Sequence, residues 1–200
     1  MQKTIFDTPV INTLMRWASV LILRLMGWKA EGVCPGVPKY VLIAAPHTSN
    51  WDFPITLMLC FVLRLRVHWV GKSTLFPWGA GWLARWLGGI AVDRSAQSNM
   101  VQSTIDAFGR ARRLAVIVAP EGTRGKVTHW KTGFYHIARG AGVPIALAYL
   151  DFGRKAGGIG QMFTPSGDIG RDMATIQQFY QGIRGKHRDR FDGDQIGRPD

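Results

Sequence analysis

A histidine and an aspartate capable of acid–base chemistry lie close together in the stretch 46–52, which reads PHTSNWD. His47 and Asp52 are five positions apart, which is a rotation of roughly 140° on a helix and places them on opposite faces of a strand. The two side chains can therefore meet only across a turn, for which Ser49 and Asn50 are suited, and Asn50 or Asp52 could cap a following helix. A histidine held by a carboxylate can remove a proton from a hydroxyl group.

Two further charged stretches could bind an anion. Arg94 ends the stretch IAVDR, and the sequence PEGTR at 120–124 directly follows an apolar run. The guanidinium groups of Arg94 and Arg124 are forked donors suited to a phosphate or a carboxylate, and Gly122 lets backbone amides approach such a group closely. Glu121 could orient an arginine or a substrate hydroxyl. The plainer alternatives are a surface ion pair for Arg94 and an ordinary turn at 120–124.

Several other catalytic arrangements have no support in this sequence. A Gly-x-Ser-x-Gly elbow, a Cys–His nucleophile spacing and a zinc ligand set are all missing. The remaining chemistry is direct attack, in which a substrate hydroxyl deprotonated by His47 attacks an activated acyl carbon. The other histidines have no comparable setting and are interpreted as structural or surface residues: His68, His129, His136 and His187.

Short apolar runs alternate with amphipathic segments, which is typical of an α/β domain. The pattern predicts strands over residues 40–45, 67–70, 90–94, 114–119 and 143–150, and helices over 10–28, 54–65, 97–113, 133–141 and 170–184, the last capped by Asp168. Residues 153–160 are glycine-rich and indicate a loop, and 161–165 an edge strand. We expect a single mixed, mostly parallel sheet flanked by helices. Ligands in such folds bind beyond the carboxyl ends of the strands, where the three charged stretches would meet.

Composition restricts the partners of this domain. The chain has 200 residues, enough for one domain with a substantial core, and 46% of them are hydrophobic, which excludes disorder. The formal net charge of +12 implies an anionic partner, and eight tryptophans favour a membrane interface or, alternatively, stacking on bases. Cys34 and Cys60 form no disulfide pattern and favour a reducing compartment.

Two apolar segments could contact a membrane. Residues 1–30 contain a helix whose apolar run is interrupted by Arg16 and Arg24, so it is too short to span a bilayer and is predicted to lie in the membrane surface with Trp17 and Trp28 as anchors. Packing of that helix on the core is the alternative. A second segment carries tryptophans every four residues, a ridge that suits either the core or a lipid-facing surface: Trp78, Trp82 and Trp86.

On these residues the chain resembles the glycerolipid acyltransferase family of the lysophosphatidic acid acyltransferase type. His47-x4-Asp52 resembles the catalytic motif of that family, and 89–94 (GIAVDR) is similar to a block ending in a substrate-binding arginine, here Arg94. The block at 120–124 resembles the one that lines the acceptor phosphate site, which implies that role for four residues here: Glu121, Gly122, Thr123 and Arg124. Lys131 and Gly133 fall where the family often has Lys-x-Gly, which implies a substrate-binding role for Lys131, and 143–145 (VPI) fits an apolar strand near the acyl path. Pro46 and Ala119 depart from the usual residues of the family.

The resemblance implies an α/β acyltransferase domain over residues 31–184, and the mixed charges, glycines and proline of 185–200 indicate a flexible tail. It implies an acyl-CoA or acyl-carrier protein donor, a lysophospholipid acceptor such as 1-acylglycerol-3-phosphate, and no metal or organic cofactor. A peripheral or monotopic place on the cytoplasmic face of the cell membrane is expected, and no nucleic acid partner. Acylation of a lyso-aminolipid or a glycolipid is an alternative. A non-catalytic basic module that binds membranes or nucleic acid would explain the charge and the tryptophans, but not the two charged motifs.

Overall fold

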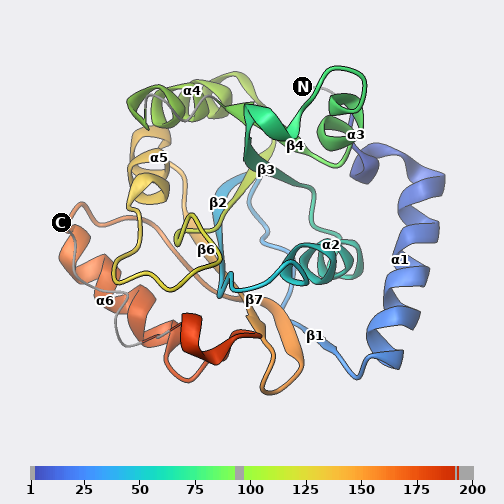
Figure 1. The fold of residues 1–200 in the computed structure, drawn as a ribbon. Helices are drawn as coiled ribbons and strands as arrows, with labels where there is room; N and C mark the ends of the chain where they lie inside the picture. The colour runs from blue at the N-terminus through green and yellow to red at the C-terminus, as the bar shows by residue number, and fades with distance from the viewer. Residues whose placement is uncertain (1–2, 93–96, 192, 194–200) are drawn as a thin grey trace.

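The computed structural model describes residues 3–92, 97–191 and 193, and these form an α/β fold built on one sheet (Figure 1). The sheet has the order β1-β7-β6-β2-β5-β3-β4, and only the β6–β7 pair within it is antiparallel. The expected single mixed, mostly parallel sheet is confirmed. Its strands are β1 (Lys29–Glu31), β2 (Lys39–Ala45), β3 (Val67–Lys72), β4 (Gly89–Val92), β5 (Leu114–Val118), β6 (Ile145–Asp151) and β7 (Ala156–Phe163).

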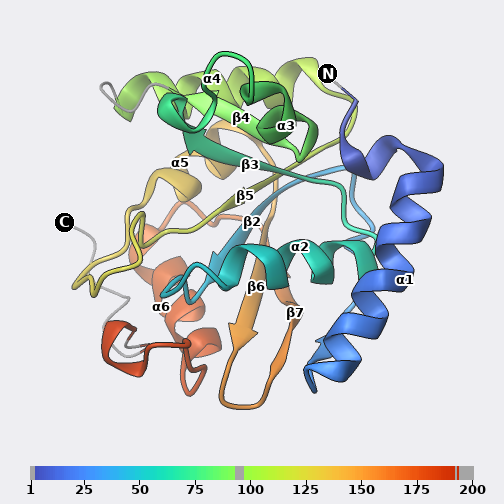
Figure 2. The same ribbon diagram turned by 45° about the vertical axis from the view of Figure 1, so that its right-hand side comes forward.

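Helices cover both faces of the sheet (Figures 1 and 2). The α-helices are α1 (Pro9–Leu25), α2 (Asp52–Val62), α3 (Gly81–Trp86), α4 (Gln97–Arg110), α5 (Gly133–Ala141) and α6 (Ile169–Tyr180). Within the described residues, three short 3-10 turns accompany them: η1 (Ile5–Asp7), η2 (Ser73–Leu75) and η3 (Arg188–Arg190). The predicted cap of the last helix is confirmed, because the Asp168 carboxylate accepts a hydrogen bond from the Arg171 amide at 3.1 Å.

Strand β2 lies in the middle of the sheet and is buried on both faces, as a nearly continuous apolar run requires. Val41 and Ile43 pack with buried residues of α4, α5 and α6, whereas Tyr40 and Leu42 pack with residues of α2 and η1. Helix α1 packs outside α2, as both ribbon views show (Figures 1 and 2). The alternation of side chains along one strand thus organises both halves of the core.

The register of the central strands brings their carboxyl ends together. Ile43 of β2 pairs with Val118 of β5, and Trp69 of β3 pairs with Ile117 of β5. Because these strands are parallel, the segments that follow β2 and β5 leave the sheet at the same edge, which delivers the His47 turn and the 120–124 stretch to one place.

The expected loop at 153–160 and the expected edge strand at 161–165 are each only partly right, because the turn ends at Lys155 and residues 161–163 continue a longer strand that begins at Ala156. Residues 156–163 form β7, which lies inside the sheet between β6 and β1, and the short strand β1 is the edge. Strand β7 is rich in glycine because its neighbours approach closely: a Cβ atom at Gly158 would lie 1.8 Å from the carbonyl oxygen of Glu31, and one at Gly157 would lie 2.7 Å from Leu59 Cδ1.

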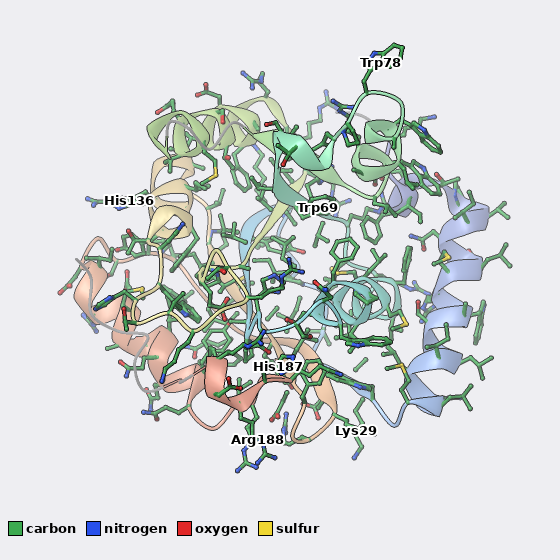
Figure 3. The ribbon with its side chains drawn as sticks, viewed as in Figure 1. Lys29, Trp69, Trp78, His136, His187 and Arg188 are labelled. Carbon is green, nitrogen blue, oxygen red and sulfur yellow. The ribbon has the colours of Figure 1, made fainter. Side chains whose placement is uncertain are left out.

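The tryptophan ridge expected on one helix does not form. Helix α3 has only six residues, and Trp78 precedes it in a turn where Gly79 has a φ of +92°. Trp78 is fully exposed and projects from the molecule in Figure 3, and Trp82 is 62% exposed, so both belong to the surface. Trp86 instead packs against the core cluster beneath α2.

Helix α1 keeps an apolar outer face. The buried residues of this helix are Ser19 and Leu23, and the exposed apolar residues are Val10, Leu14, Trp17, Leu21, Ile22 and Leu25. Trp28, expected as a second membrane anchor, is buried and packs edge-on against Phe152. Among the described residues, no helix has both the length and the apolar character needed to cross a membrane.

Candidate active site

The His47 turn directly follows β2 and closes on itself through Asp52. The His47 Nδ1 atom lies 3.2 Å from Asp52 Oδ2, so the two side chains meet across the turn as the spacing predicts. Asp52 Oδ2 also accepts hydrogen bonds from the amides of Thr48 (2.7 Å) and Ser49 (2.8 Å), and Oδ1 accepts one from the Ser49 hydroxyl (2.7 Å). The carboxylate is thereby fixed from the N-terminal side of α2.

These hydrogen bonds decide the charge of Asp52. The side chain of Asp52 is 4% exposed, and burial by itself raises the pKa of its carboxyl. The hydrogen bonds from the His47 ring and from Ser49 outweigh that effect and hold the pKa below its ordinary value. Asp52 is therefore an anion that accepts from Nδ1 of His47, which leaves Nε2 free to accept a proton. Asp52 is the first residue of α2 rather than its cap, since no side chain caps this helix.

Glu121 supports the His47 turn from the neighbouring strand end. Its Oε1 atom accepts a hydrogen bond from the His47 backbone amide at 2.8 Å, and its Oε2 atom is buried with no hydrogen-bond partner in the described part of the chain. Glu121 is 3% exposed, and burial raises the pKa of its carboxyl to about 7. The resemblance implies that Glu121 lines the acceptor site, but here the side chain points to the turn and does not line the cavity described next.

A cavity of about 690 Å³ lies beside His47, between β3 and β5 on one side and α4 and α5 on the other. One part of its wall is polar and contains five of the predicted site residues: His47, Gly122, Thr123, Arg124 and Lys131. The rest is mainly apolar and is lined from four elements by residues that include Trp69, Ile117, Val118, Met100, Phe134 and Ile137. The cavity therefore joins a cationic region next to a histidine with an apolar region under the helices.

The cationic region depends on the conformation of Gly122. Gly122 has a φ of +67°, which glycine adopts without steric cost. The aliphatic end of Lys131 lies across it, since a Cβ atom at Gly122 would be 3.2 Å from Lys131 Cδ, Cε and Nζ. The Lys131 amide donates to the Pro120 carbonyl at 3.0 Å, which closes the loop. Thr123 accepts a hydrogen bond from the Gly125 amide at 3.3 Å.

The remaining site predictions have mixed outcomes. Arg94 lies outside the described residues. The exposed His136 points away from the molecule, and His129 is also exposed and bonds to Thr128 (Figure 3). His187 has a structural contact, as expected, because its amide donates to Thr48 Oγ1 at 3.3 Å. The sequence contained no signal for this contact, because the two residues are 139 positions apart. Within the described residues no group of three or more His, Cys, Asp or Glu side chains could hold a metal ion.

Comparison with known proteins gives one family match and one structural match. A family model described as Acyltransferase matches residues 36–149, which contain the His47 turn, the 120–124 stretch and Lys131. No curated protein sequence matches the chain significantly. Among solved structures, the crystal structure of the 1-acyl-sn-glycerophosphate (LPA) acyltransferase PlsC from Thermotoga maritima has the same fold, with a TM-score of 0.54 and 18% sequence identity over 78% of this chain and 70% of that chain.

Proposed function

Since this chain belongs to the acyltransferase family and is an acyltransferase, we propose that it moves a fatty acyl chain from acyl-CoA or acyl-carrier protein to the hydroxyl of a lysophospholipid such as 1-acylglycerol-3-phosphate. The observation that carries the proposal is a carboxylate-held histidine that lines a cavity together with Arg124 and Lys131. The Thermotoga maritima protein, which shares the fold, is a 1-acyl-sn-glycerophosphate acyltransferase, and this supports the choice of acceptor.

His47 acts as the general base in the proposed reaction. Nε2 accepts the proton of the acceptor hydroxyl while the hydroxyl oxygen attacks the thioester carbonyl carbon. The carbon–sulfur bond then breaks, and the imidazolium returns the proton to the departing thiolate. Asp52 holds Nδ1 and stabilises the imidazolium between these two steps. No covalent intermediate on the protein is required.

Arg124 and Lys131 bind the phosphate of the acceptor in this proposal. Both are exposed side chains on the cavity wall next to His47, and a guanidinium and an ammonium are the usual partners of a phosphate. Gly122 and Thr123 line the same wall. We assign Arg94 the same role from the family resemblance. The apolar region of the cavity, between the sheet and α4 and α5, is suited to a hydrocarbon chain.

We further propose that α1 lies in the surface of the cell membrane, on its cytoplasmic face. Its outward row of Val10, Leu14, Trp17, Leu21 and Leu25 follows helical spacing and is exposed. Trp78 and Trp82 add exposed rings from α3 and the turn before it, and α3 itself lies near the N-terminal end of α1 in both ribbon views (Figures 1 and 2). A lipid acceptor would then reach the enzyme without leaving the bilayer.

The test is transfer of a radiolabelled acyl chain from acyl-CoA, or from acyl-carrier protein, to lysophosphatidic acid. We expect His47→Ala to lower kcat by at least about 100-fold, because general-base catalysis contributes about 10²–10⁴-fold. His136→Ala is the matched control, since His136 is exposed and does not line the cavity. Full activity of the His47 variant would refute the mechanism. A panel of lyso-aminolipids and glycolipids with one donor distinguishes the alternative acceptors.

A further inference from the structure

The chain beyond α6 crosses the His47 turn. We call residues 184–190 the C-terminal strap; they follow α6 and end in η3. The Arg184 carbonyl accepts a hydrogen bond from the Phe152 amide at 2.8 Å, which anchors the start of the strap to the end of β6. The strap lies outside residues 36–149, the part of the chain that the family model matches. Figure 3 labels two of its residues, His187 and Arg188.

Two hydrogen bonds connect the strap to Thr48, the residue next to His47. The His187 amide donates to Thr48 Oγ1 at 3.3 Å, and Arg190 Nη1 donates to the Thr48 carbonyl at 3.4 Å. Thr48 is 1% exposed, and its own amide donates to Asp52 Oδ2 at 2.7 Å. The strap therefore contacts the peptide unit that orients the carboxylate.

Gly185 packs directly against the turn. A Cβ atom at this position would lie 2.8 Å from both Cγ2 and Oγ1 of Thr48 and 3.3 Å from Pro46 Cβ. Contacts below 3 Å do not fit without movement, so only glycine permits this close approach. The adjacent ammonium group of Lys186 lies 5.4 Å from the ring centre of Trp51, which precedes Asp52. The strap thus contacts residues adjacent to both members of the dyad, Pro46 and Thr48 beside His47 and Trp51 beside Asp52.

We propose that the C-terminal strap is a positioning element for the catalytic base: by holding Thr48, it keeps Asp52 and His47 at the distance that proton transfer requires. This inference rests on the proposed role of His47. The hydrogen bonds between the strap and the rest of the described chain involve Thr48 and Phe152, and neither residue lines the cavity. Its effect is therefore expected on kcat rather than on substrate binding. A displacement of 1 Å in such a group can lower the rate by about 100-fold.

The first experiment places a methyl group in the contact. We expect Gly185→Ala to lower kcat by about 10- to 100-fold with KM for lysophosphatidic acid within about twofold of the wild type. Gly36→Ala is the matched control, because a Cβ atom at Gly36 meets nothing within 4 Å. Amide hydrogen exchange of the full chain should show faster exchange at Thr48 and Ser49 in Gly185→Ala only, since both amides donate to Asp52.

The second experiment makes room for the methyl group that Gly185→Ala adds. Thr48→Ala removes both atoms that the new methyl group would meet at 2.8 Å. The double variant Gly185→Ala with Thr48→Ala should therefore recover kcat to the level of Thr48→Ala alone, which we expect several-fold below the wild type because alanine lacks the acceptor for the His187 amide. If Gly185→Ala does not fold, Thr48→Val and Thr48→Ser replace it: valine removes the acceptor for the His187 amide and should lower kcat several-fold, whereas serine keeps the acceptor and should stay near the wild type.

Unchanged kcat and unchanged exchange in Gly185→Ala would overturn the proposal, as would a loss that Thr48→Ala does not relieve. Equal activity of the valine and serine variants would do the same. Failure of the proposed function gives a different result. A wild-type chain that transfers no acyl group to any lysolipid refutes the proposed function. The exchange rates of Thr48 and Ser49 in Gly185→Ala then still decide whether the strap holds the turn.

Discussion

Glu121 holds the His47 backbone rather than facing the cavity, and this changes the chemistry expected of it. Its Oε1 atom accepts the His47 amide, while Oε2 is buried without a described partner. An ionised carboxylate in that setting has lost hydration that one hydrogen bond does not replace. The carboxyl is therefore best interpreted as a support for the catalytic turn whose ionisation opposes folding.

A pH dependence of stability follows at this residue. Burial raises the folded-state pKa of Glu121 to about 7, above the ordinary value of 4.5, so the folded state binds its proton more tightly than the unfolded state. The protonated carboxyl contributes about 3 kcal/mol to the stability of the folded state. This contribution is fully present below pH 4.5 and is lost as the pH rises through about 7. We expect the free energy of unfolding of the wild type, measured with urea, to fall by up to that amount between pH 4.5 and pH 8 relative to that of Glu121→Gln, which cannot ionise.

The comparison between the two proteins at each pH cancels the contributions of titrating groups that do not interact with Glu121, whereas His47 and Asp52 do interact with it. Parallel pH profiles for the wild type and Glu121→Gln would contradict the assignment. Glutamine keeps an oxygen that can accept the His47 amide, so the variant should also keep most of the transfer activity, whereas Glu121→Ala should lose more because the amide then has no acceptor.

At the scale of elements, α1 has two faces with different partners. Its inner face, with Ser19 and Leu23, packs on the domain, and its outer face presents large apolar side chains to solvent. Large exposed apolar patches on soluble surfaces mark interaction sites. The predicted alternatives for this helix, packing on the core or lying in the membrane surface, are compatible, because each concerns a different face.

Substitution of the outer face should therefore weaken membrane binding without unfolding the domain. Trp17 and Leu21 are 67% and 59% exposed, and burying such a side chain in lipid is worth about 1.5–3 kcal/mol. We expect Trp17→Ser with Leu21→Ser to lower the vesicle partition coefficient by at least about tenfold and to leave the melting temperature nearly unchanged. Met162→Ser, an exposed apolar residue on β7, is the control. Equal partition of wild type and double variant in a sedimentation assay would show that α1 is not the contact.

At the scale of the whole molecule, net charge and apolar surface act together. The formal charge of +12 attracts an anionic surface at long range, and the exposed face of α1 supplies contact at short range. Salt screens the first effect and not the second, because the Debye length falls from about 10 Å at 0.1 M salt to about 3 Å at 1 M.

Vesicle composition and salt separate these two contributions. We expect binding to vesicles with anionic lipid to weaken at least about tenfold between 0.05 M and 0.5 M salt, and binding to neutral vesicles to change little. Steep salt-dependent binding to duplex DNA without binding to either vesicle would favour the alternative of a nucleic-acid module instead.

Local patterns in the sequence were sufficient for the sheet class, the central strands and the meeting of His47 with Asp52. Buried strands such as 40–45 and 114–119 are continuous apolar runs, and parallel strands bring their carboxyl ends to one edge whatever their exact order. The five-residue spacing allowed the pair to meet only across a turn, as it does. These features depend on a few neighbouring residues and on the general geometry of α/β sheets.

The features that only the tertiary structure decided are contacts between distant parts of the chain. A glycine-rich run becomes strand β7 because Glu31 and Leu59 approach it, and Trp28 is buried because Phe152 lies against it. Glu121 turns toward the His47 amide because β2 and β5 are paired neighbours. The strap reaches Thr48 across 139 positions. Periodicity describes how a segment buries its own side chains, whereas these outcomes depend on which other segment lies against it.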